Sequence, residues 1–135
     1  MWLEGSEMLC NPLGGAMTRS LYEKIGGFGA VSNIVLNFYG KVLESDAIAP
    51  YFAAVDMPRL IDHQTQFVCA LLGGPASFSD DQIRNVHRPA AITREAFDRA
   101  VVLFEESLIE AALEPADVAA AVKLFEGKRA LVVTV

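Results

Sequence analysis

The chain has 135 residues, a formal net charge of −6 at pH 7, and 53% hydrophobic against 21% charged residues. This length predicts one domain that buries a core without needing disulfides. The acidic balance argues against nucleic-acid binding, because a phosphate backbone requires a basic face. The longest uncharged stretch, residues 26–40, is shorter than the ~20 apolar residues of a membrane-spanning helix. We therefore expect a soluble domain without a membrane anchor.

The first residues lack the basic start and continuous apolar run of a secretory signal. We expect residues 1–18 to form an N-terminal extension and residues 19–135 to form the domain. Cys10 and Cys69 are far apart and form no CxxC pair, which favours a reducing compartment and a cytoplasmic location. A disulfide between them remains an alternative.

Apolar residues recur at helical spacing in the first third of the chain. A short helix is predicted from about Ser20 to Ile25, ended by the pair Gly26-Gly27. A longer helix is predicted for residues 28–44, with an apolar stripe at Val31, Ile34, Val35, Phe38 and Val42. One helical turn is expected to follow, ending near Pro50-Tyr51-Phe52.

Capping residues divide the rest of the chain into helices. Asp56 is a suitable N-cap for a helix that ends at Gly73-Gly74. Ser79 begins a capping box for a short helix that ends near His87, because Pro89 follows. Thr93 caps the next helix. The last helix begins at residues 114–115, and residues 130–135 are expected to be its frayed end. Since no segment has a convincing strand pattern, the fold class is all-α.

The chain has only two histidines, His63 and His87, on either side of the turn at residues 72–75. Helices on both sides of this turn would place the imidazoles across a shared apolar gap. A flat apolar ligand with a central metal fits such a gap, and the iron of haem is commonly held by one histidine. The alternative is ordinary, since a lone histidine near a helix end is more often structural or exposed.

Two further polar side chains are predicted near the gap. Gln64 lies within an apolar stripe, and a buried amide without partners costs ~1–3 kcal/mol. Tyr39 adjoins Phe38 and can bring a hydroxyl to the same pocket, opposite His87. The expected apolar lining consists of Phe38, Phe52, Leu60, Phe67, Val68, Ile83, Val86, Ile92 and Phe97. Most of these residues would also suit an ordinary core.

Other chemistries lack their motifs. The sequence contains no GxGxxG, no P-loop and no nucleophile elbow. Two histidines without CxxC or HExxH do not make a zinc site.

Several short strings carry a family resemblance through their order and spacing. They are residues 20–27, 37–39, 51–52, 55–60, 63–64, 67, 72–75, 86–87 and 92–93. With these strings the chain closely resembles the group I truncated hemoglobins from about Ser20 to the C-terminal helix. The resemblance implies a 2-on-2 globin fold, which is a helical sandwich around a haem.

The resemblance also implies a role for each matching residue. His87 matches the proximal iron ligand, Tyr39 the distal tyrosine that hydrogen-bonds the gaseous ligand, and Gln64 the glutamine that assists it. The other matches are Leu60 at the distal gate, Phe52 against the haem, and Phe38, Phe67 and Val68 in the pocket.

The resemblance leaves the roles of three polar residues undecided. In some members a histidine matching His63 binds the iron as a second axial ligand, and in others this position meets a haem propionate. Arg59 and Arg84 are further candidates for the propionates, because guanidinium groups suit carboxylates.

The chain departs from the family pattern in two ways. The run Arg88-Pro89-Ala90-Ala91 stands where glycines are usual, which predicts a stiffer turn beside the proximal histidine. Some relatives attach haem covalently through a histidine in the last helix. This chain has no histidine after His87, so we expect non-covalent haem.

Three functions are compatible with these residues. The first is reversible binding of oxygen, nitric oxide or carbon monoxide, with two distal donors slowing oxygen release. The second is a haem redox enzyme such as a nitric oxide dioxygenase. It would need a partner reductase, because the chain has no flavin or nicotinamide domain. The third is a haem-free helical interaction module. We expect a monomer or a weak dimer.

Overall fold

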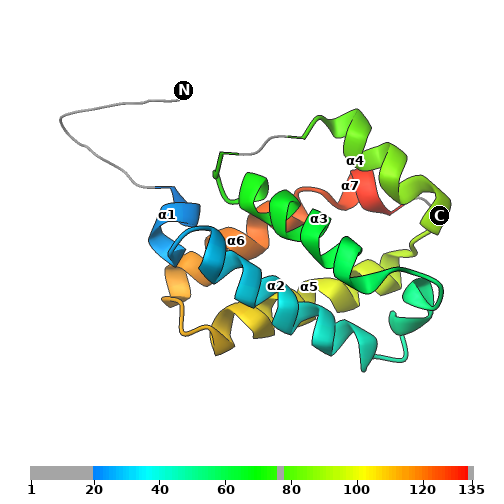
Figure 1. Cartoon of the computed structure of the whole chain (residues 1–135), viewed down its shortest axis with the longest axis horizontal. Helices are drawn as coiled ribbons and strands as arrows, with labels where there is room; N and C mark the ends of the chain where they lie inside the picture. Colours follow the sequence, from blue (N-terminus) through cyan, green and yellow to red (C-terminus); the bar gives the residue numbers. More distant parts are fainter. Residues whose placement is uncertain (1–19, 76–77, 134–135) are drawn as a thin grey trace.

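The computed structural model describes residues 20–75 and 78–133, and every regular element in these ranges is helical (Figure 1). The elements are α1 (Leu21–Ile25), α2 (Phe28–Leu43), η1 (Ala49–Phe52), α3 (Met57–Leu71), α4 (Asp80–His87), η2 (Arg88–Ala90), α5 (Arg94–Glu110), α6 (Pro115–Glu126) and α7 (Arg129–Val132). The all-α prediction is confirmed, whereas the predicted extension 1–18 lies outside the described residues.

The predicted caps fix where the helices begin. The Asp56 side chain accepts a hydrogen bond from the backbone N–H of Arg59, and Ser79 forms the expected capping box with Gln82. Thr93 caps α5 in the same way. Each side chain satisfies a backbone donor that the first turn of a helix leaves unpaired.

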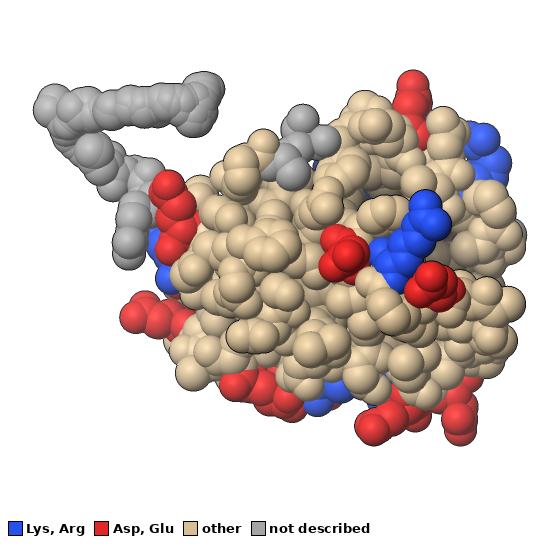
Figure 2. Space-filling model, viewed as in Figure 1, with Lys and Arg blue, Asp and Glu red and all other residues tan. Residues whose placement is uncertain are grey.

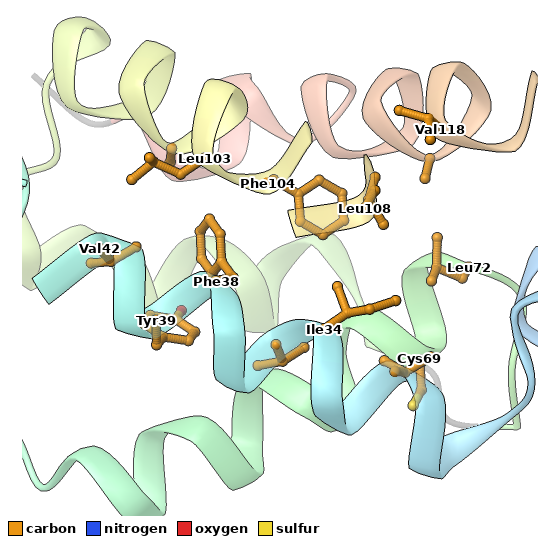
Figure 3. Close-up of a cluster of buried hydrophobic side chains, with 14 of the residues drawn as sticks. Ile34, Phe38, Tyr39, Val42, Cys69, Leu72, Leu103, Phe104, Leu108 and Val118 are labelled. Carbon is orange, nitrogen blue, oxygen red and sulfur yellow. The ribbon is translucent and has the colours of Figure 1, made fainter. Parts of the chain in front are cut away.

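The core lies between two helix pairs. Helix α2 packs on α3 and on α5, and α5 packs on α6, so one pair faces the other. Figure 3 shows Phe38 pointing from α2 toward Phe104 of α5. Leu108, Val31 and Val42 are fully buried in this cluster. Cys69 is a buried free thiol in the same core.

A close backbone approach joins α1 to the end of α3. The N–H of Tyr22 donates to the carbonyl of Leu72 at 3.0 Å. A Cβ on Gly74 would lie 2.8 Å from both the Cys69 carbonyl oxygen and Cδ1 of Tyr22. Glycine is therefore needed at this position for packing, because any side chain would separate the two segments.

The expected frayed end is wrong for residues 130–133. Gly127 and Lys128 end α6, and the chain turns into the separate helix α7, which packs on α4. Leu131 and Val132 are buried against Ile83 and Phe97. Burial of these two apolar side chains explains why the chain turns back instead of fraying into solvent.

Arg129 holds the start of α7 in place. Its guanidinium donates to Glu126 at 3.0 Å and to Asp98 at 2.6 Å, and it lies 4.7 Å from the centre of the Phe97 ring. Within the described ranges, no helix is long and apolar enough to cross a membrane.

We predict that Leu131→Ala lowers the free energy of unfolding by ~2–4 kcal/mol, because it leaves a cavity between α4, α5 and α7. Denaturant unfolding measures the change. The matched control is Ala130→Ser, on an exposed position of the same helix, with an expected change within about 0.5 kcal/mol. Equal small effects for both variants would contradict the packing of α7.

Candidate functional site

A cavity of about 270 Å³ lies between α2 and α3 on one side and α4 and α5 on the other. Its lining is almost entirely apolar. Most of the residues predicted from sequence line it, namely Phe38, Tyr39, Phe52, Leu60, Gln64, Phe67, Val68, Val86, His87, Ile92 and Phe97. The structure therefore brings the predicted proximal and distal residues together around one space.

Four predicted residues lie outside this lining. Ile83 packs with α7 in the second core cluster instead. His63 and Arg59 are exposed on α3. Arg84 pairs with Asp81 at 3.0 Å on the surface of α4. For Ile83 the reason is the packed helix α7, which the sequence pattern did not predict.

His87 is the last residue of α4, and its ring is held by its own helix. Nδ1 lies 2.8 Å from the carbonyl oxygen of Ile83, one turn earlier. When Nδ1–H donates to this oxygen, the lone pair of Nε2 is free to bind a metal. A backbone partner of this kind is typical of histidines that ligate metals. His87 is half-buried and lines the cavity.

Tyr39 brings a buried hydroxyl to the cavity from α2. Its ring meets Phe38 edge-on at 4.9 Å and Phe52 at 5.8 Å between ring centres. The hydroxyl has no hydrogen-bond partner among the described residues, although buried tyrosines usually have one. Burial raises the pKa of Tyr39 well above its usual value, so the group remains a neutral donor.

Gln64 brings an amide to the same cavity from α3. It is half-buried, and its side chain has no hydrogen bond to any described residue. Tyr39 and Gln64 therefore offer unpaired donors to whatever fills the space, and a polar group of a ligand would satisfy them.

These residues fit a haem better than a bare metal ion. Residues 20–75 and 78–133 contain no group of three histidine, cysteine, aspartate or glutamate side chains that could hold an ion. A metal bound by His87 alone must arrive within a cofactor that supplies the other ligands. The apolar lining suits the flat, apolar macrocycle of such a cofactor.

Sequence reasoning missed part of the lining. The missed residues are Val35, Val42, Ile48, Tyr51, Val55, Leu71, Ala90, Ala96, Ala100, Phe104, Phe125, Lys128 and Val132. Val35 and Val42 were identified only as members of an apolar helix stripe. Among the missed residues, Tyr51 links η1 to the start of α5. Its hydroxyl lies 3.5 Å from Oγ1 of Thr93 and 3.4 Å from the Thr93 backbone nitrogen.

The unusual run after His87 forms a short 3-10 helix, η2, which contains Pro89. Ala91 ends it with φ 52° and ψ 50°, in the left-handed region. A side chain in this conformation costs about 1 kcal/mol relative to glycine. The chain therefore uses alanine where the backbone geometry favours glycine.

Comparison with known proteins identifies the fold and the family. The family described as bacterial-like globin matches residues 20–133. The chain is 30% identical over 111 residues to a group 1 truncated hemoglobin of Tetrahymena pyriformis, covering 82% of this chain and 92% of that protein. It is 36% identical over 78 residues to one of Mycolicibacterium paratuberculosis, covering 58% of this chain and 57% of that protein.

Solved structures agree with this result. The Fe(III) form of the Tetrahymena pyriformis truncated hemoglobin superposes with a TM-score of 0.78 at 29% identity, covering 84% of this chain and 97% of that one. The 2/2 hemoglobin of Synechococcus sp. PCC 7002, in the cyanomet state with covalently attached heme, gives 0.80 at 29% identity, covering 87% and 100%. The chain belongs to the bacterial-like globin family. Within that family it is a group 1 truncated hemoglobin, as its sequence resemblance predicted.

The raised pKa of Tyr39 predicts a stability change at high pH. The unfolded chain releases the phenol proton near pH 10, whereas the folded chain keeps it. The stability contribution is therefore full below this pH and is lost as the pH rises above it. We predict that the free energy of unfolding falls more steeply for the wild type than for Tyr39→Phe, by up to ~1.4 kcal/mol per pH unit. Denaturant titrations at several pH values from about 9 to 11 measure the difference between the two proteins. Parallel curves would contradict the burial of the phenol.

Proposed function

We propose that this chain binds haem non-covalently and thereby binds a diatomic gas reversibly, either oxygen, nitric oxide or carbon monoxide. The observation that carries the proposal is the pairing of two features around one apolar cavity. His87 has a free Nε2 because Nδ1 is engaged by the Ile83 carbonyl, and Tyr39 has a buried hydroxyl without a partner.

His87 acts as the proximal ligand in this proposal. The haem supplies an iron with one position for an imidazole and one for a small ligand. The hydrogen bond to Ile83 fixes the tautomer and the direction of the ring, so the imidazole is oriented before the cofactor enters. Ile83 is itself held by α7, which keeps the end of α4 in position.

Tyr39 and Gln64 act on the gas. Both present hydrogen-bond donors to the cavity, and a diatomic ligand that gains negative charge is stabilised by such donors. The low polarity of the lining strengthens these hydrogen bonds relative to those in water. Together they contribute ~1–3 kcal/mol, which corresponds to roughly tenfold to a hundredfold slower release.

The non-covalent mode of binding rests on the chain's own composition. The Synechococcus structure contains covalently attached heme. Here His63 and His87 are the only histidines, and none follows His87. A bond between haem and a histidine of α6 or α7 therefore has no residue to form it.

A second proposed function is a partner-reduced nitric oxide dioxygenase or another haem redox enzyme. The Tyr39 hydroxyl is a buried donor without a partner among the described residues, which favours slow release, and slow release suits a reaction in the cavity better than gas delivery. Electrons would come from a separate reductase. We also propose a cytoplasmic location, which agrees with the free thiol of Cys69.

We predict that the protein reconstituted with haem shows a Soret band that depends on His87. His87→Gly removes the ligand to the iron and changes the ferrous spectrum, and added imidazole restores it. The matched control is His63→Ala, which leaves the spectrum unchanged because His63 is exposed and outside the cavity lining.

Two results would contradict this assignment in different ways. A wild-type protein without a Soret band would contradict haem binding altogether. A split low-spin pattern that disappears in His63→Ala would instead show that His63 enters the sixth position, with gas binding gated by its release.

We predict that Tyr39→Phe and Gln64→Leu each raise the oxygen dissociation rate, with the larger effect for Tyr39→Phe, and that the two changes combined raise it roughly tenfold to a hundredfold. Both changes remove a donor and keep most of the side-chain volume. Stopped-flow displacement of oxygen by carbon monoxide measures the rates. Val35→Ala changes the lining without removing a donor and serves as the control. Equal effects in all three variants would point to altered access instead of lost hydrogen bonds.

A further inference from the structure

Helix α2 has an outer side that no described element covers. We call this side the open face of α2. After the first two, which are adjacent, its residues recur every three or four positions and share one side of the helix. They are Phe28, Gly29, Asn33, Leu36, Gly40 and Leu43, and all are exposed. Three of them are large apolar residues, with Phe28 55%, Leu36 58% and Leu43 47% accessible. Figure 2 shows mainly uncharged atoms where α2 faces the viewer.

The charge of α2 is turned away from this face. Lys41 is the only charged residue of the helix. Its ammonium lies 2.7 Å from Oε2 of Glu110 and 3.7 Å from Oε1 of Glu106, both on α5. A chain with a net charge of −6 therefore presents an uncharged helix face. Such a face is suited to contact with another protein surface.

The two glycines of the open face have no role within the described chain. Neither Gly29 nor Gly40 has a positive φ, and a Cβ at either would meet no atom within 4 Å. Glycine inside a helix is less favourable than alanine because it gains more freedom on unfolding. The missing side chains do allow another backbone to approach closely.

The residues of the open face are arranged so that two copies of the helix, running in opposite directions, can fit each other. Gly29 and Leu43 are each seven positions from Leu36. In an antiparallel pair of α2 helices with a two-fold axis at Leu36, each Leu43 lies over Gly29 of the other copy. The two Leu36 side chains then meet at the axis. A two-fold interface requires this kind of self-complementary surface.

The same pairing complements the charge at the helix ends. Glu44 and Phe28 are each eight positions from Leu36, so Glu44 of one copy would lie at the first residue of α2 in the other. That helix start has Gly27 as N-cap, without a side-chain cap, and no acidic residue in its first turn. A carboxylate at this end is favourable because it meets the positive end of the helix dipole.

We propose that this chain forms a two-fold symmetric dimer through the open face of α2. A second copy is the partner that supplies both the reversed leucine–glycine pattern and the Glu44 carboxylates. The two cavities lie on the inner side of α2, away from the contact, so the dimer leaves the candidate site intact.

Sedimentation velocity of the full haem-loaded chain over a range of concentrations tests the dimer. We expect a dimer at tens of micromolar. Leu36→Glu places two carboxylates against each other at the axis and should raise the dimer dissociation constant on the order of a hundredfold. Ile109→Glu is the matched control, because Ile109 is equally exposed, at 58%, but lies on α5. It should leave the constant unchanged.

Two further variants separate contact from folding. Gly29→Leu fills the space that Leu43 of the other copy needs, so it should weaken the dimer without lowering the melting temperature of the monomer. Leu36→Cys in a Cys10→Ser background should form a disulfide-linked dimer on mild oxidation, whereas Ile109→Cys should not. A wild type that stays monomeric at all concentrations overturns the proposal. Equal effects of Leu36→Glu and Ile109→Glu, or equal cross-linking of the two cysteine variants, also overturn it.

Discussion

The hydrogen bond between Nδ1 of His87 and the Ile83 carbonyl is the interaction on which the site depends. It fixes which nitrogen of the imidazole is available, but it can do so only if α4 itself is fixed. Helix α4 has eight residues, too few to be stable alone, and Ile83 is its one buried side chain. The position of the imidazole therefore depends on what covers Ile83.

Helix α7 provides that cover, and Arg129 holds α7 in turn. The guanidinium of Arg129 joins Glu126, Asp98 and the face of Phe97, while Leu131 and Val132 pack beneath α4. Phe97 and Val132 also line the cavity. The C-terminal residues therefore contribute to the proximal side of the site, although they are last in the chain and carry no ligand.

Helical rotation explains which predicted residues could be placed from the sequence. Leu60, Gln64, Phe67 and Val68 form one stripe of α3, and all of them line the cavity as predicted. Successive residues of a helix differ by about 100°. His63 is turned by about this angle from Gln64, which places it at the edge of the stripe, and it is exposed. The N-caps at Asp56, Ser79 and Thr93 could also be predicted from the sequence, because each depends on a local hydrogen bond.

Long-range contacts explain what the sequence could not show. Residues 130–133 are apolar, and two of them are valines, a pattern shared by a frayed end and by a short buried helix. Only the packing of α7 on α4 distinguishes these possibilities, and it joins segments about fifty residues apart. Because Ile83 packs against α7, it does not line the cavity as the sequence had predicted. One missed helix therefore accounts for two corrections, that of the chain end and that of Ile83.

Helix α2 shows how two constraints can share one element. Its inner side must pack Phe38 against α5 and present Tyr39 to the cavity, which fixes the identity of those residues. On its outer side a Cβ at Gly29 or Gly40 would meet no described atom within 4 Å, and Leu36 is 58% exposed, so the packing of the described residues does not fix the identity of these three positions. Folding alone would favour polar helix formers at these positions. The apolar and glycine residues found there therefore call for a cause outside the described residues, and close contact with a second α2 helix is a sufficient one.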